Sequence, residues 1–169
     1  VKYSSDDKWH TMNHTKLDNM GIETSATLNF YELLGKTSFL KKATIGYSYI
    51  NQDKVIGNVY ESNYSLDYLK HKFVAPLDHR IWRNLRANWA FRWQSREGSY
   101  AIYEGMKEVG KKAYPSFCLL DLKLSWNSPN YTFYAEANNL LDRKYYDIGN
   151  IPQPGIWGKV GVSYRINFK

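Results

Sequence analysis

Strict alternation of apolar and polar residues is the feature that most constrains how this chain can fold. The last stretch, GKVGVSYRINFK (158–169), shows it most clearly. A period of two over about ten residues is typical of a β-strand whose two faces meet different surroundings. The apolar set is Val160, Val162, Tyr164, Ile166 and Phe168, and the small, polar or charged set is Lys159, Gly161, Ser163, Arg165 and Asn167.

Six other stretches alternate in the same way, and helical periodicity is scarce. Runs of this kind, separated by turn residues, predict an all-β fold built from antiparallel strands. We therefore expect about seven strands. They cover residues 22–33, 43–50, 64–68, 85–93, 118–126, 131–138 and 158–168.

The connections between the expected strands come in two sizes. Short, turn-like connections contain Gly, Pro, Asn or Asp, and all five prolines lie in or beside a connection. Alternation of short turns with long loops is typical of an up-and-down transmembrane β-barrel. The short connections are 34–38, 76–80 and 127–130, and the long ones are roughly 52–60, 95–116 and 142–157.

One hairpin can be predicted in register. With 127–130 as its loop, apolar residues face apolar residues across the two strands. On the polar face Asp121 lies opposite Glu136, which is mildly unfavourable, so we expect Lys123 or a neighbouring Arg to compensate. The predicted pairs are Trp126–Tyr131, Leu124–Phe133, Leu122–Ala135, Ser125–Thr132, Lys123–Tyr134 and Asp121–Glu136.

Composition narrows the class of protein without deciding what covers the apolar faces. The formal net charge is +7 and aromatic residues make up 17% of the chain. Such a surface suits nucleic acid, an anionic membrane or an acidic ligand. The single cysteine, Cys118, excludes an internal disulfide or a cysteine metal cluster. The chain contains no run of 18 apolar residues, so the sequence predicts no transmembrane helix.

The distribution of aromatic and charged residues favours lipid over a protein core. Trp and Tyr lie near the ends of the apolar sets and Leu or Ala in the middle, as in the aromatic girdles of membrane barrels. A small closed core would not bury the charges of the opposite face, whereas a water-containing lumen accommodates them. The residues that we expect to face the lumen and a ligand path are Arg86, Arg92, Asp121, Lys123, Glu136 and Arg165.

The stretch YTFYAEANNLLDRKYYDIGNIPQPGIWGKVGVSYRINF (131–168) carries a further signal. It resembles the carboxy-terminal end of TonB-dependent outer-membrane receptors, in which an Asn-Leu-Phe-Asp-x-x-Tyr-like motif and a Pro-Gly loop precede a final strand ending in an aromatic residue. Upstream, Asn13, Gly21 and Glu23 fit the pattern that opens a strand in that family. The matching motif residues are Asn139, Leu140, Asp142, Tyr145, Pro152, Pro154 and Gly155, with Leu141 in place of Phe.

The resemblance implies a barrel of about 22 strands filled by an N-terminal plug domain. Seven strands are too few to close such a barrel. We therefore expect residues 1–169 to be its C-terminal part, with the plug and the N-terminal strands either on a separate chain or missing from this one. The first ten residues lack a signal peptide, which fits a missing natural start.

The resemblance also implies a function. Receptors of this family import a bulky, scarce nutrient such as cobalamin or a siderophore-type metal chelate across the outer membrane of Gram-negative bacteria, and DIGNIPQPGIW (147–157) is similar to cobalamin receptors. The implied partners are the rest of the receptor, TonB through the plug, membrane lipid, lipopolysaccharide, the barrel-assembly machinery and a surface lipoprotein. The implied assembly signal is Tyr164, Ile166 and Phe168. We expect no enzymatic activity, cofactor, metal site or nucleic-acid partner.

Two alternatives remain open at this point. A stand-alone small outer-membrane barrel needs an even number of strands, so it would require an eighth strand within residues 1–19. A soluble β-protein would use its Trp and Tyr rings as stacking platforms for carbohydrate or nucleic acid.

Overall fold

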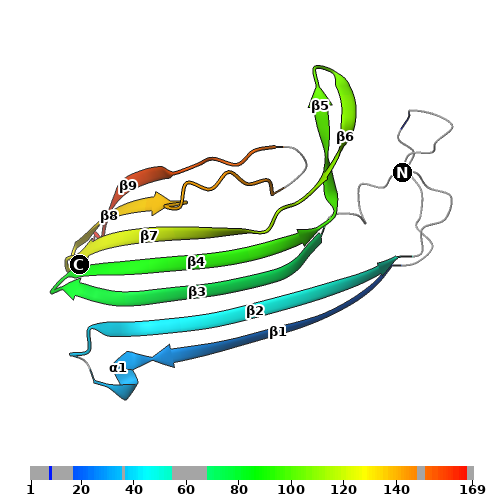
Figure 1. Ribbon diagram of the computed structural model, residues 1–169. Helices are drawn as coiled ribbons and strands as arrows, with labels where there is room; N and C mark the ends of the chain where they lie inside the picture. The colour runs from blue at the N-terminus through cyan, green and yellow to red at the C-terminus, as the bar shows by residue number, and fades with distance from the viewer. Residues whose placement is uncertain (1–7, 9–16, 36, 55–67, 148–150, 167–169) are drawn as a thin grey trace.

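The computed structural model describes residues 8, 17–35, 37–54, 68–147 and 151–166. Its main feature is one antiparallel sheet of seven strands, in the order β1-β2-β3-β4-β7-β8-β9 (Figure 1). A separate two-stranded ribbon, β5–β6, extends from one end of the sheet (Figure 1). The strands of the sheet are β1 (Leu17–Asn29), β2 (Leu40–Lys54), β3 (Tyr68–Trp82), β4 (Leu85–Glu97), β7 (Phe117–Asn127), β8 (Tyr131–Asn138) and β9 (Trp157–Tyr164). The remaining elements are α1 (Phe30–Leu33), β5 (Ser99–Glu104) and β6 (Lys107–Ala113).

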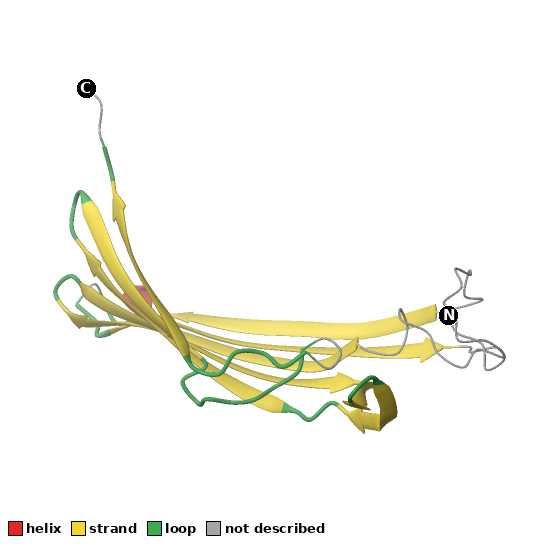
Figure 2. Ribbon diagram, turned by 90° about the horizontal axis from the view of Figure 1, so that it is seen from above, coloured by secondary structure: helices red, strands yellow, loops and turns green. Residues whose placement is uncertain are grey.

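The seven-stranded, all-β architecture confirms the prediction from the alternating pattern. Strands adjacent in the sheet follow each other along the chain, apart from the β5–β6 ribbon inserted between β4 and β7. The short connections gather at one end of the sheet, which we call the short-turn end, and the long ones gather at the opposite, long-loop end (Figure 1). The sheet is twisted and curls at β8 and β9 (Figure 2), as expected for strands of a barrel wall.

The prediction of a turn at 76–80 was wrong, and residues 64–67 of the strand expected at 64–68 lie outside the described residues. Residues 68–82 form one continuous strand, and the turn is at Arg83 and Asn84. Pro76 is the reason for the misassignment, because a proline inside a sheet removes a ladder hydrogen bond. On the β4 side Pro76 pairs with Ala90, but on the β2 side neither Ala75 nor Pro76 has a partner. The strand therefore accommodates proline by interrupting one ladder only.

Other expected boundaries also differ, and the strands expected at 43–50 and 85–93 are longer, at Leu40–Lys54 and Leu85–Glu97. The strand expected at 22–33 begins at Leu17 and ends at Asn29, and the next four residues form a single helical turn. The long connection 95–116 contains the β5–β6 ribbon, with Gly105 at positive φ in its turn. The final strand ends at Tyr164, and residues 167–169 lie outside the described part.

The β7–β8 hairpin is shifted by two residues from the predicted register. The Ser128 N–H donates to the Tyr131 carbonyl at 2.8 Å, so only Pro129 and Asn130 lie outside the ladder. Because a shift of two keeps every side chain on its predicted face, the apolar and polar faces are unchanged. The predicted opposition of Asp121 and Glu136 is not formed. The observed pairs include Trp126–Phe133, Leu124–Ala135, Leu122–Ala137 and Lys123–Glu136.

One face of the sheet, which we call the outer face, exposes large apolar side chains. Ile22, Ile45 and Val160 are 64%, 57% and 83% exposed. Contact between water and so wide an apolar surface is unfavourable. Aromatic rings border this face. Trp82 and Trp126 meet edge to face at the short-turn end, with 6.3 Å between their centroids. Within the described residues, no helix is long and apolar enough to cross a membrane.

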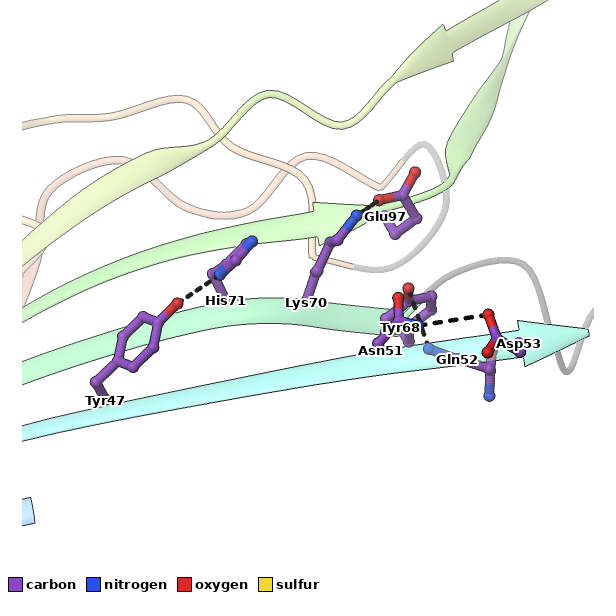
Figure 3. A network of polar contacts seen from close by, with 8 residues as sticks. All are labelled: Tyr47, Asn51, Gln52, Asp53, Tyr68, Lys70, His71 and Glu97. Carbon is purple, nitrogen blue, oxygen red and sulfur yellow. Dashed lines mark hydrogen bonds and ion pairs between the residues drawn. The ribbon is translucent and has the colours of Figure 1, made fainter. Parts of the chain in front are cut away.

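At the long-loop end, the outer face is bordered by rings and hydrogen bonds. The Tyr47 hydroxyl and His71 Nδ1 are hydrogen-bonded at 2.7 Å, and the His71 ring lies 5.0 Å from Tyr49 and 6.2 Å from Trp93 (Figure 3). Nearby, Lys70 pairs with Glu97 at 2.9 Å (Figure 3). Two aromatic borders enclosing an apolar band are what a bilayer requires of a barrel wall.

Candidate functional site: the polar face and its covering loop

The second face of the sheet, which we call the polar face, carries a row of polar residues that crosses all seven strands. The register places one residue from each strand directly beside the next. Opposite charges or amides alternate along most of the row, and such cross-strand neighbours stabilise a sheet. From β1 to β9 the row reads Asn29, Lys42, Asp78, Asn88, Lys123, Glu136 and Lys159.

Glu136 is the centre of the charged part of this row. Its two carboxylate oxygens accept from Lys123 Nζ at 2.7 Å and Lys159 Nζ at 2.8 Å, and its side chain is only 15% exposed. Lys123 also lies 4.6 Å from the centroid of the Tyr134 ring. That ring covers Gly161, where any side chain would collide with it. The arrangement fixes the charged groups on the face away from the apolar band.

Glu136→Gln should lower the urea midpoint of unfolding more than either Lys123→Ala or Lys159→Ala. Glu136 contacts both ammonium groups, so removing its charge leaves two cations side by side, whereas either lysine variant preserves one ion pair. The midpoints can be measured on the folded protein in detergent by tryptophan fluorescence. A lysine variant that is less stable than Glu136→Gln would contradict the central position of the carboxylate.

A cavity of about 360 Å³ lies on the polar face at its short-turn end. We call it the basic cavity. Among the described residues, no carboxylate forms an ion pair with Lys42, Arg80, Arg83 or Arg86, although Asp78 lies beside Lys42 in the row. The cavity therefore concentrates positive charge. Such a concentration attracts anions through the surrounding water. Its lining residues are Asn29, Tyr31, Lys41, Lys42, Arg80, Arg83 and Arg86.

The connection between β8 and β9, described at 139–147 and 151–156, is here called the covering loop, and its described parts lie over the polar face at its long-loop end (Figure 2). Asp147 Oδ1 accepts from Gln94 Nε2 at 3.2 Å and from Arg96 Nη2 at 3.1 Å. Gln94, on β4, is only 5% exposed. This contact therefore anchors the loop to the wall through a charge-assisted hydrogen bond.

Aromatic rings add to the same anchor. The Tyr145 ring lies 4.4 Å from Phe117, and burial raises the pKa of the Tyr145 phenol above its usual value. The Tyr146 ring stacks on Tyr100 of the β5–β6 ribbon at 4.6 Å. Most of the buried apolar residues of the described chain lie beneath this loop and ribbon. The two long connections thus form one packed unit on the polar face.

The motif that begins at Asn139 has a structural explanation. Asn139 is 3% exposed and has a positive φ of 52°, a conformation that Asn tolerates well. Its side chain donates to the carbonyls of Arg143 and Pro154 and accepts from the Arg143 N–H. Its own N–H donates to Asp121 Oδ1 at 2.8 Å, and Leu140 N–H donates to the Leu120 carbonyl. The motif therefore ties the first end of the covering loop to β7 and the second end, through the Pro154 carbonyl, to Asn139.

The second half of the motif closes the loop near β9. Asp142 Oδ1 accepts from the Ile156 N–H at 3.0 Å, and a side chain at Gly155 would collide with that oxygen. Glycine is therefore required at 155 by close approach. Pro152 forms an isolated antiparallel bridge with Tyr146.

The polar face holds the predicted lumen residues, but it does not bring them into one site. Lys123 and Glu136 are joined in the charged row, and Arg86 lines the basic cavity. Asp121 anchors the covering loop. Asp147 was not predicted, because nothing in a loop sequence shows which strand it contacts. Lys42 and Arg80 were not predicted because the expected strand began at 43 and 76–80 was assigned to a turn, and Arg83 lay between two expected elements.

The remaining predicted residues lie apart from these groups. Arg92 is on the polar face opposite Val74 and Leu119. Arg165 lies at the short-turn end, where its N–H donates to the Asn130 carbonyl. Tyr164 and Ile166 of the expected assembly signal are 67% and 64% exposed, and Phe168 is outside the described residues. No group of three or more potential metal-ligating side chains occurs in the described ranges.

Comparison with known proteins gives one match. The family model described as TonB dependent receptor-like, beta-barrel matches residues 4–140. No curated protein and no solved structure matches the chain. The matched range covers β1 to β8, whereas most of the motif at 139–155 lies beyond it. The match agrees with the apolar outer face, the polar face and the seven-stranded sheet. The chain therefore belongs to the TonB-dependent receptor-like β-barrel family, whose members are transporters, not enzymes, of the bacterial outer membrane.

Proposed function

We propose that this chain forms part of the wall of a receptor that imports a bulky, scarce nutrient, such as a metal chelate or cobalamin, in a TonB-dependent manner. The observation that carries the proposal is the polar face, with a row of polar and charged residues across all seven strands and a long loop folded onto it. A polar wall of this kind lines a water-containing lumen. The apolar outer face faces the bilayer.

We further propose that the sheet is completed by other strands of the same receptor. Within the described residues β1 pairs only with β2, and β9 pairs only with β8. Their free edges expose backbone N–H and C=O groups, which lipid leaves unsatisfied. The plug, which contacts TonB in this proposal, belongs to that remaining part. Lipopolysaccharide, the barrel-assembly machinery and a surface lipoprotein are further proposed partners.

The proposal is tested by uptake of two probes, radiolabelled cyanocobalamin and a radiolabelled ferric chelate. The receptor is produced in a Gram-negative host that lacks its own receptors for both probes, with and without TonB. We expect accumulation of one probe above the host background, lost when TonB is absent. A receptor that is folded in the outer membrane and imports neither probe would contradict the proposed substrate range.

Replacing arginines of the basic cavity should slow the uptake of an anionic chelate. Arg80→Gln with Arg86→Gln removes two cations that have no ion-pair partner among the described residues. We expect a several-fold lower rate at low salt and a smaller difference at high salt, because salt screens attraction over these distances. Removal of two cations from the β5–β6 ribbon, Lys107→Gln with Lys112→Gln, is the matched control. Equal loss in both double variants would argue against a role specific to the cavity.

A further inference from the structure

The outer face contains an apolar groove of about 500 Å³ near the short-turn end. This volume is within the range of about 300–1,000 Å³ typical of ligand pockets. The groove crosses β4, β7, β8 and β9, and its surface is almost wholly apolar. Residues that line it include Leu85, Leu124, Trp126, Phe133, Ala135 and Val162.

The register explains why the groove is hollow. Ala135 lies between Leu124 and Val160 on neighbouring strands, and its small side chain leaves space above it. In the next row, Trp126 and Phe133 are directly opposite each other and form a higher wall. Water is disfavoured in such a hollow because it finds no polar partners there. In an outer-membrane protein, a hydrocarbon chain is the available occupant.

The Arg83 guanidinium is linked to the groove through two indole rings. Arg83 is in the β3–β4 turn, and its Cζ lies 5.2 Å from the centroid of the Trp82 ring. Trp82 in turn meets Trp126, a wall of the groove, at 6.3 Å. Arg83 also lines the basic cavity, whose other arginines, Arg80 and Arg86, belong to the polar face, so Arg83 is the cation of this cavity that contacts the tryptophan pair at the short-turn end.

We propose that this groove and Arg83 form a binding site for one anionic glycerophospholipid. An acyl chain fills the groove above Ala135, and the lipid phosphate binds the Arg83 guanidinium, whose planar donors suit phosphate oxygens. Trp82 and Trp126 lie at the level of the headgroup, where indole rings are favoured. The inference goes beyond the proposed function, since it rests on the outer face and on membrane location and is independent of any imported nutrient.

Selectivity should come from the headgroup and from the shape of the groove. Bulk lipid covers the whole outer face equally well, so apolar contact alone gives no preference for one lipid. The Arg83 guanidinium favours a lipid with net negative charge. Charge and shape can therefore be tested separately, at Arg83 and at Ala135.

The test is retention of lipid by the intact receptor, purified in detergent after equilibration with equal amounts of phosphatidylglycerol and phosphatidylcholine. Native mass spectrometry counts the bound lipids. We expect one phosphatidylglycerol, retained at least fivefold over phosphatidylcholine. Arg83→Gln should bring this ratio close to one, and Ala135→Phe, which fills the groove, should remove retention of both lipids.

Two control variants are expected to behave as the wild type. Lys112→Gln removes a cation far from the groove, and Ala137→Phe makes the same substitution on the same strand and face but outside the groove lining. Heat-dependent mobility in gels verifies that each variant is folded. Equal retention of the two lipids by the wild type, or wild-type retention by both Arg83→Gln and Ala135→Phe, would overturn the proposal. Uptake measurements do not enter this test, so its failure leaves the transport proposal unaffected.

Discussion

Leu122→Arg should lower the free energy of unfolding by about 2–4 kcal/mol, the cost of arginine near the bilayer midplane on the lipid-facing side of a barrel. Leu122 is at the centre of β7 and belongs to the outer face, between Trp89 on β4 and Ala137 on β8. No acidic residue occupies these adjacent positions. The measurement is reversible urea unfolding of the receptor in phospholipid vesicles, followed by tryptophan fluorescence.

The matched control is Lys123→Ala, one residue further along the same strand. Lys123 points to the polar face, and its removal leaves Glu136 paired with Lys159. We therefore expect little change in stability. Equal losses at positions 122 and 123 would contradict the assignment of the two faces, and a larger loss at 123 would reverse it.

The two faces of each strand could be predicted from sequence, because successive side chains along a strand point to alternate faces of the sheet. The β7–β8 hairpin shows how robust this is. Its register was wrong by two residues, yet Leu124 and Lys123 remained on their predicted faces. The number of strands in the sheet was also predicted, although β3 shares only Tyr68 with the run expected at 64–68.

Cross-strand neighbours were less predictable, because they depend on turn positions. The assignment of 76–80 to a turn concealed the fact that Asp78 and Arg80 belong to β3. The row from Asn29 to Lys159 is visible only once all six strand pairings are known. Residues 76–80 contain proline and aspartate, which are turn formers by local preference, but pairing with β4 outweighs that preference.

The covering loop was the least predictable part. The resemblance singled out Asn139, Asp142 and Gly155, but it assigned them no physical role. Their hydrogen bonds show that they hold a loop closed, and the contacts of Asp147 with Gln94 and Arg96 show where it lies. A loop without periodicity gives no sequence signal for such long-range contacts.

Asn139→Ala should release the covering loop from the polar face. The substitution removes three hydrogen bonds and leaves the Arg143 N–H and the Arg143 and Pro154 carbonyls without their partner. Each hydrogen bond contributes about 0.5–1.5 kcal/mol net, since Arg143 and Pro154 are exposed and water can partly replace their partner. Alanine at positive φ costs about a further 1–2 kcal/mol. We therefore expect a total of several kcal/mol, sufficient to open the loop locally.

The measurement is limited digestion with trypsin, which cleaves after Arg143 and Lys144 once the loop opens. Cleavage should be at least tenfold faster in Asn139→Ala than in the wild type, while the strands remain protected. Asn130→Ala, in the exposed β7–β8 turn, is the matched control and should leave the rate unchanged. Asn139→Gly separates the two causes, because glycine removes the backbone strain but restores none of the hydrogen bonds. If Asn139→Gly is digested at the wild-type rate, backbone conformation and not the side-chain hydrogen bonds holds the loop in place.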